Sequence, residues 1–177
     1  MKGLVHIYHG YGKGKTTAAI GLAVRAAGND IPVVVVRFLK TDRSGELAVL
    51  EKISQIHLIP TEKNFKFAFC MSDEEKAEAG RLCTKMLESA FDKAYALAAG
   101  GKTLLVMDEV LDAVNCGFVE KQRLIRLLNE RPEGLEVVMT GRNPAAEQVE
   151  LADYVTEMKK EKHPYDQGIM ARKGIEF

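Results

Sequence analysis

The sequence predicts an α/β fold in which a mostly parallel sheet is flanked by helices. Short apolar runs rich in β-branched residues alternate with segments of helical composition along all 177 residues, which is the pattern of repeated βαβ units. The run at 32–39 (PVVVVRFL) shows little polar alternation, as expected of a strand buried on both faces. The length suits one domain, and no linker or repeat divides the chain, so we expect residues 1–177 to form a single domain.

The first half of the chain carries three strand signals and one clear helix. A strand is expected at 3–8 (GLVHIY), where the apolar run ends at closely spaced glycines. A helix is expected at 15–27 (KTTAAIGLAVRAA), because Gly28 is a natural C-terminal stop. The strand at 32–39 is followed, after a weakly helical stretch, by a short strand at 56–59.

The second half opens with an aromatic, irregular stretch at 60–71, followed by the longest helix, at 73–99. Ser72 and Glu75 form an S-x-x-E capping box that starts this helix. The remaining elements are a strand at 103–108, an amphipathic helix at 119–131 that stops before Pro132, a strand at 135–140, a short helix ending near Leu151, and a strand at 154–158.

The strongest chemical signal is HGYGKGKTT, at 9–17, which ends in the G-K-[ST] of a P-loop. It lies between an expected strand and an expected helix, as such a loop must. Glycines allow backbone N–H groups to turn toward phosphate oxygens, and the positive N-terminus of the following helix points at the same anion. The expected ATP-binding residues are Gly10, Tyr11, Gly12, Lys13, Gly14, Lys15, Thr16, Thr17 and Arg142.

Within this loop, Lys15 is expected to neutralise the terminal phosphates and Thr16 to offer its hydroxyl to Mg²⁺. The strict P-loop pattern has glycine where this chain has His9, which leaves open a turn that merely connects strand to helix. Three glycines, two lysines and two threonines within eight residues favour phosphate binding. The expected fold is therefore of the P-loop NTPase (RecA-like) type.

Two further sites are expected at the same edge of the sheet, because ligands bind outside the carboxyl ends of parallel strands. Asp108 and Glu109 follow the strand at 103–108 and are candidate Mg²⁺ ligands. Acids at strand ends are also common helix caps, and spacing does not say which of the two lies nearer the metal. Arg142 follows the strand at 135–140 and would neutralise phosphate, or it is a solvated loop arginine.

Charge and composition restrict the function class. The chain has 25 basic and 25 acidic residues, and this neutrality argues against a nucleic-acid binder. Residues 1–29 nevertheless hold four basic residues and no acidic one, so positive charge gathers around the phosphate loop. No window is apolar enough to cross a membrane, no signal peptide is present, and three cysteines without CxxC spacing indicate reduced thiols. We expect a cytoplasmic protein.

Several segments resemble, in their order, the P-loop ATP:corrinoid adenosyltransferases. These are GYGKGKTTAAIGLAVRAAG, the strand end VRFLK, LLVMDEV, LNERPEGLEVVMTGR and ELADYVTEMKKEKHPYDQGIMARKGIEF. The resemblance covers nearly the whole chain. Its most specific parts are the G-x-G-K-G-K-T-T-A-A loop and the C-terminal K-H-x-(F/Y)-D-x-G segment, which P-loops in general lack.

The resemblance implies an enzyme that transfers the 5′-deoxyadenosyl group of ATP to the Co(I) of a reduced corrinoid and releases triphosphate. It implies ATP as co-substrate, Mg²⁺, a reduced flavin protein as electron donor and a homodimer. Because Co(I) is itself the nucleophile, the protein supplies positioning and electrostatics, which suits a sequence without a convincing Ser/His/Asp or Cys/His set. Lys13, Lys15 and Thr16 would then be the catalytic residues.

The resemblance also assigns Phe65 and Phe67 to the corrinoid, as aromatic residues that fill the space below the ring. Phe67 stands where many relatives have Trp, and this chain has none. The alternative is a strand face, with Phe65, Phe67 and Phe69 buried in the core. Two other functions remain open on the motifs: a small P-loop kinase or ATPase, with Glu109 positioning water, and a non-catalytic ATP-dependent regulatory module.

Overall fold

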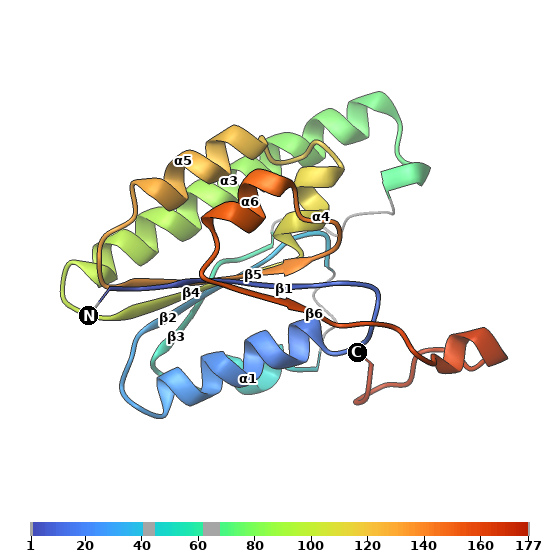
Figure 1. The fold of residues 1–177 in the computed structure, drawn as a ribbon, viewed down its shortest axis with the longest axis horizontal. Coiled ribbons are helices and arrows are strands. Elements are labelled where there is room, and N and C mark those ends of the chain that lie inside the picture. The colour runs from blue at the N-terminus through green and yellow to red at the C-terminus, as the bar shows by residue number, and fades with distance from the viewer. Residues whose placement is uncertain (1, 41–44, 62–67, 177) are drawn as a thin grey trace.

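The computed structural model describes residues 2–40, 45–61 and 68–176. Its centre is a sheet in the order β3-β2-β4-β5-β1-β6, in which every neighbouring pair of strands is parallel. The α/β fold with a parallel sheet is therefore confirmed (Figure 1). The strands are β1 (Val5–His9), β2 (Val33–Arg37), β3 (Ile56–Leu58), β4 (Thr103–Asp108), β5 (Leu135–Gly141) and β6 (Tyr154–Glu157).

Helices cover both faces of the sheet (Figure 1). On one face lies α1 (Lys15–Ala27), and on the other lie α3 (Asp73–Ala98), α4 (Val110–Asn115), α5 (Lys121–Asn129) and α6 (Ala146–Leu151). A four-residue helix, α2 (Leu47–Leu50), precedes β3, and two 3₁₀ turns, η1 (Ala68–Cys70) and η2 (Pro164–Gln167), lie outside the sheet. This two-sided cover explains why the central strands are apolar throughout.

The strands divide their side chains between two cores, because successive residues of a strand point to opposite faces. In β2, Val34 and Val36 join the core under α3, whereas Val33 and Val35 join the core under α1. The α3 core contains large side chains such as Leu87 and Phe91. The buried residues of α1, by contrast, are all alanines: Ala19, Ala23 and Ala27.

The local helix signals act as the sequence predicts. The side chain of Ser72 accepts a hydrogen bond from the backbone N–H of Glu75, and the Glu75 side chain accepts one from the backbone N–H of Ser72, which completes the capping box of α3. Helix α1 spans the predicted residues 15–27. Several strands are shorter than predicted. In particular, β2 ends at Arg37 instead of residue 39, because Leu39 takes a left-handed backbone conformation with φ of 56°.

The interpretation of Phe69 as part of a buried strand is wrong. Phe69 lies in the turn η1 and is 84% exposed. Phe65 and Phe67 lie outside the described residues, so their assignment to a corrinoid stays a prediction.

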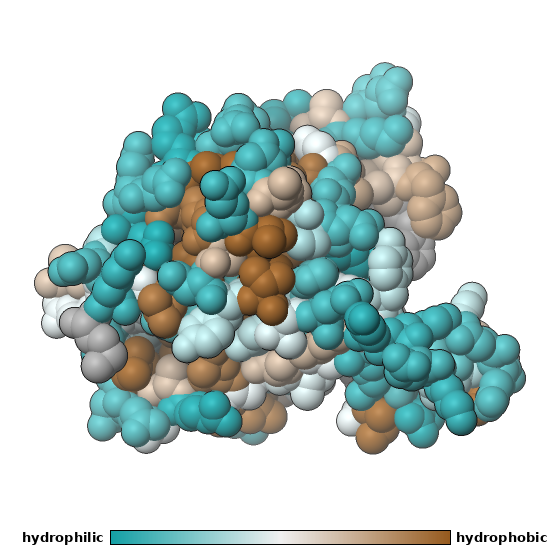
Figure 2. Space-filling model, viewed as in Figure 1, coloured by the Kyte–Doolittle hydropathy of each residue, from teal (hydrophilic) through white to brown (hydrophobic). Residues whose placement is uncertain are grey.

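The chain after β6 leaves the body of the domain as an exposed segment (residues 158–176, the C-terminal segment) (Figure 1). Figure 2 shows it as a mainly hydrophilic projection beside the sheet and helices. Within the described ranges, no helix is both long and apolar enough to span a bilayer. Cys70, Cys83 and Cys116 are all free thiols, as the sequence predicts.

Candidate nucleotide-binding site

The predicted phosphate loop joins the carboxyl end of β1 to the N-terminus of α1. Gly10 and Gly14 have φ angles of 110° and 115°, a left-handed region that favours glycine. No side chain caps the start of α1, and its first turn carries no acidic residue. The helix therefore presents its positive end and backbone N–H groups to an incoming anion.

Two glycines of this loop are also required because the backbone that follows β6 lies against them. A Cβ atom on Gly10 would lie 2.5 Å from the carbonyl oxygen of Met158, and one on Gly12 would lie 2.6 Å from that of Lys159. The backbone N–H of Gly12 donates to the Met158 carbonyl at 2.7 Å, and the N–H of Met158 donates to the carbonyl of His9. The loop is thus held against the first residues of the C-terminal segment.

Lys15 folds back over the loop. Its ammonium donates to the carbonyl oxygens of Gly10 at 2.7 Å and of Gly12 at 2.9 Å. Burial, and then the positive charge of Arg142, lower the pKa of Lys15 from its ordinary value, against the pull of nearby carboxylates. Because its hydrogen bonds are to neutral carbonyl oxygens, the Lys15 ammonium is well placed to bind phosphate oxygens instead.

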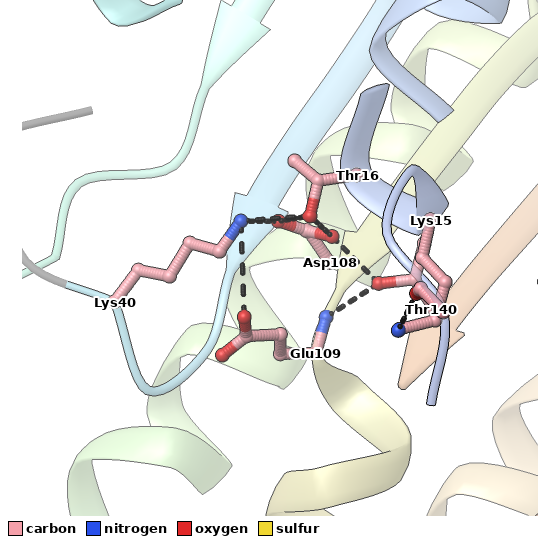
Figure 3. A network of polar contacts seen from close by, with 7 residues as sticks. Lys15, Thr16, Lys40, Asp108, Glu109 and Thr140 are labelled. Carbon is pink, nitrogen blue, oxygen red and sulfur yellow. Dashed lines mark hydrogen bonds and ion pairs between the residues drawn. The ribbon is translucent and has the colours of Figure 1, made fainter. Parts of the chain in front are cut away.

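A buried carboxylate stands opposite the loop, as Figure 3 shows. Asp108, at the end of β4, has no exposed surface. It accepts hydrogen bonds from the hydroxyl of Thr16 at 3.0 Å and from the hydroxyl of Thr140 at 2.6 Å. The carboxyl ends of β4 and β5 therefore meet the phosphate loop that follows β1. Asp108 is the acid that contacts Thr16.

Lys40 supplies the positive charge of this network. Its ammonium lies 2.5 Å from Oδ2 of Asp108, 2.8 Å from the Thr16 hydroxyl and 3.8 Å from Oε1 of Glu109. The Lys40 side chain is only 18% exposed. Because a buried carboxylate is costly without a partner, this ammonium stabilises Asp108 (Figure 3).

Glu109 differs from Asp108 in backbone and in charge. It has a left-handed φ of 61° immediately before α4, and its backbone N–H donates to the Thr140 hydroxyl at 2.8 Å. Burial raises the pKa of Glu109 to about 7, although the charge of Lys40 acts against the shift. Its side chain is 33% exposed, so it can face a ligand in solution.

Another charged side chain near the phosphate loop belongs to Arg142, the residue that follows β5. Arg142 is exposed, and its guanidinium carbon lies 5.6 Å from the centre of the Tyr11 ring, in cation–π range. Tyr11 also shares hydrogen bonds with Asn143. On α4, burial raises the pKa of Asp112, while the positive charges of Arg142 and Lys15 act against this. Arg142 therefore faces the phosphate loop.

The oxygen atoms at this edge fit a magnesium ion bound together with phosphate. Thr16, Asp108 and Glu109 offer the hard oxygen ligands that Mg²⁺ prefers, and the ammonium of Lys40 lies among these same three side chains. Within the described parts of the chain, no group of three or more His, Cys, Asp and Glu residues could hold a metal. Thr16, Asp108 and Glu109 would supply part of a coordination shell, which phosphate oxygens would complete.

Comparison with known proteins decides the family. Residues 1–177 match the family described as "ATP:corrinoid adenosyltransferase BtuR/CobO/CobP". The chain belongs to this family.

Individual relatives agree with this family over nearly the full chain. Proteins named corrinoid adenosyltransferase are 32% identical in Sinorhizobium sp., 32% in Escherichia coli K12 and 33% in Pseudomonas aeruginosa. Each alignment covers 99% of this chain and 81%, 86% and 84% of the relative, respectively. The match is therefore to most of each relative and not to a shared loop alone.

Among solved structures, the cytoplasmic domain of the Thermomonospora curvata Type VII secretion ATPase EccC overlaps 94% of this chain with a TM-score of 0.48 and 16% identity. The overlap covers 21% of that protein. Assignment to the adenosyltransferase family rests on the sequence matches and not on this overlap.

The structure brings together most of the residues predicted for this family member. Lys15, Thr16, Asp108 and Glu109 surround the same edge, with Arg142 beside the loop. Lys13 and Thr17 are exposed; they lie in the loop and in the first turn of α1 without joining the network of Asp108. The roles of all these residues as ligands stay predictions.

Three residues of the site were not predicted individually: Lys40, Thr140 and Asp112. Lys40 and Thr140 lie in segments that resemble the family, VRFLK and VVMTGR, and each follows or ends a buried strand. Their position at a strand's carboxyl end is the signal that could have found them. Asp112 lies on α4, a six-residue helix too short to give a periodic pattern.

Proposed function

We propose that this protein transfers the 5′-deoxyadenosyl group of ATP to the Co(I) of a reduced corrinoid, with release of triphosphate. The observation that carries the proposal is the family match over residues 1–177. The position of the phosphate loop opposite the buried Asp108 supports the proposal, because this arrangement suits a nucleoside triphosphate bound with Mg²⁺. The substrate is the nucleophile, so the protein needs no nucleophilic side chain of its own.

The chain's residues then act by binding and by neutralising charge. Lys15 exchanges its bonds to the Gly10 and Gly12 carbonyls for oxygens of the triphosphate, whose negative charge grows as the C5′–O bond breaks. The uncapped start of α1 adds its positive end. Arg142, beside Tyr11, neutralises a further part of the leaving group. Mg²⁺, held by Thr16, Asp108 and Glu109, supplies additional charge stabilisation when bound.

The corrinoid side of the site is assigned to Phe65 and Phe67. Apolar rings below the corrin would exclude water and a lower axial base, which helps the cobalt to reach Co(I). Replacing Phe67 by alanine should therefore reduce adenosylation of complete cobalamin more than that of a corrinoid without a lower base. The measurement is the initial rate with each acceptor under identical reducing conditions. Equal losses on both acceptors would count against this role.

The proposed reaction is tested by an anaerobic assay with ATP and chemically reduced cob(I)alamin. The expected result is adenosylated corrinoid, seen in its absorbance spectrum, with one triphosphate released per corrinoid converted. A reaction without corrinoid is the control. Formation of ADP and phosphate regardless of corrinoid would contradict the proposal and favour a small kinase or ATPase. Binding of ATP without any turnover would favour a regulatory module.

The proposal extends to the protein's setting. We infer a single domain that works in the cytoplasm as a homodimer and receives electrons for its corrinoid from a reduced flavin protein. The likeness to the adenosyltransferases supports each of these points. Size-exclusion chromatography with light scattering tests the dimer, and replacing chemical reductant by a reduced flavin protein in the assay tests the donor.

A further inference from the structure

The ammonium of Lys40 lies among the side chains that we propose as ligands of Mg²⁺. Three oxygen-bearing side chains surround it: Asp108, Thr16 and Glu109, at 2.5, 2.8 and 3.8 Å. These are the same hard oxygens that would hold Mg²⁺. One fixed cation therefore already satisfies the carboxylates that a metal would need (Figure 3).

A lysine and a metal ion exclude each other at this position. Two cations a few ångströms apart repel strongly where water is scarce, and Asp108 is fully buried. The Lys40 side chain is 82% shielded from solvent, so water screens the repulsion poorly. Mg²⁺ can enter only if the ammonium leaves.

The ammonium can leave because a lysine carries its charge on a flexible four-carbon stem. In the nucleotide-free protein, the ammonium lies among the oxygens of Asp108, Thr16 and Glu109, which hold it at this position. A bound triphosphate changes this balance, because it brings several negative oxygens next to Thr16.

We propose that Lys40 is a built-in cation that fills the magnesium position in the nucleotide-free protein and moves to the triphosphate when MgATP binds. The inference rests on the proposed binding of MgATP. Its consequence is that the protein takes up the metal only together with the nucleotide. A divalent ion without nucleotide would not bind at this site. A cation would lie beside Asp108 and Glu109 both before and after MgATP binds.

The test measures binding of Mn²⁺, a spin probe for Mg²⁺, to nucleotide-free protein by electron paramagnetic resonance. The variant Lys40→Ala should bind Mn²⁺ at least about tenfold more tightly than the wild type, because the competing charge is gone. The double variant Lys40→Ala/Asp108→Asn should lose this gain. Lys93→Ala, which removes an exposed charge from α3, is the matched control and should bind like the wild type.

A second variant guards against misfolding, because Lys40→Ala leaves Asp108 without its ion pair. Lys40→Met keeps most of the stem without the charge, and circular dichroism establishes that each variant is folded. If folded Lys40→Ala and Lys40→Met bind Mn²⁺ no more tightly than the wild type, the inference is wrong. The readout needs neither corrinoid nor turnover, so it is independent of the adenosyl-transfer assay: each can fail while the other succeeds.

Discussion

The two faces of the sheet are built from side chains of different size. The α3 face buries Met86, Leu87 and Phe91, whereas α1 buries only alanines against the same strands. Short side chains let a helix lie close to its sheet, because the separation depends on the side chains at the contact. The α1 face therefore brings Thr16 within hydrogen-bonding distance of Asp108, while the α3 face supplies most of the buried apolar volume.

Stability and the predicted phosphate binding therefore depend on different faces of the sheet. Substitutions on the α3 face should change the free energy of unfolding and spare the chemistry of each folded molecule. Substitutions at the start of α1 should lower the activity and leave the free energy of unfolding nearly unchanged. Substitutions under the middle of α1 should change both the free energy of unfolding and the activity.

The largest expected effect is on the α3 face. Phe91→Ala removes a ring that is 1% exposed and packs edge-on against Tyr95 at 5.6 Å between ring centres. The free energy of unfolding should fall by about 3–5 kcal/mol, measured by denaturant titration. Phe69→Ala, at an 84% exposed ring, is the matched control and should cost less than about 1 kcal/mol. A similar loss in both variants would show that the core under α3 does not carry this stability.

The next effect belongs to the α1 face. Lys15→Ala should lower the rate of adenosyl transfer by about 10²–10³-fold or more, because one charge that stabilises the leaving group is lost. Its two bonds are to backbone carbonyls, so the free energy of unfolding should change by about 1 kcal/mol or less. Rates and denaturation curves of the same preparation decide this. Wild-type turnover in the variant would contradict the phosphate-loop assignment.

A substitution under α1 should affect both properties. Ala23 is fully buried, and Ala23→Leu should push the helix away from the sheet at a cost of about 1–3 kcal/mol. The affinity for ATP should fall as well, because Thr16 moves with the helix. Val24→Leu, at a neighbouring residue that is 44% exposed, should leave both unchanged. Loss of stability with unaltered ATP affinity would show that the spacing of α1 does not set the site.

The smallest effect concerns the pH dependence of stability. The folded-state pKa of Glu109 is raised to about 7 from 4.5, so the folded state holds this proton more tightly than the unfolded state. The associated stability is present below about pH 4.5 and is lost as the pH rises toward 7.

In nucleotide-free protein, Glu109→Gln should remove that pH dependence and raise the free energy of unfolding at pH 8. The gain is on the order of 1–2 kcal/mol once solvent screening of a side chain that is one-third exposed is allowed for. Denaturation curves at pH 5 and pH 8 measure it. A wild type and a variant with parallel pH profiles would contradict the raised pKa.

Much of this architecture follows from local signals. Gly14 and Gly28 delimit α1, and Ser72 with Glu75 starts α3, so these helices could be predicted closely. The meeting of Thr16 with Asp108 could also be predicted, because the carboxyl ends of parallel strands share one edge.

The parts that could not be predicted depend on backbone turns and on pairing across the chain. Lys40 contacts Asp108 because Leu39 before it takes a left-handed backbone conformation. No pattern of apolar residues predicts this turn. Thr140 touches Asp108 only because β4 and β5 are neighbours in register. Spacing alone could not show that Asp108, and not Glu109, contacts Thr16, because Glu109 has a left-handed backbone conformation.

The strand order has a consequence for how the protein is made. β1 leaves the ribosome well before β5 and β6, its two neighbours in the sheet. Likewise, the backbone N–H of Gly12 can donate to the Met158 carbonyl only after Met158 has been synthesised. A nascent chain that stops before β6 therefore carries the complete glycine-rich motif without the strand that shapes it. Such a chain lacks the backbone contacts that hold the loop in the folded domain, so we expect the loop to take its folded shape only after Met158 has been added.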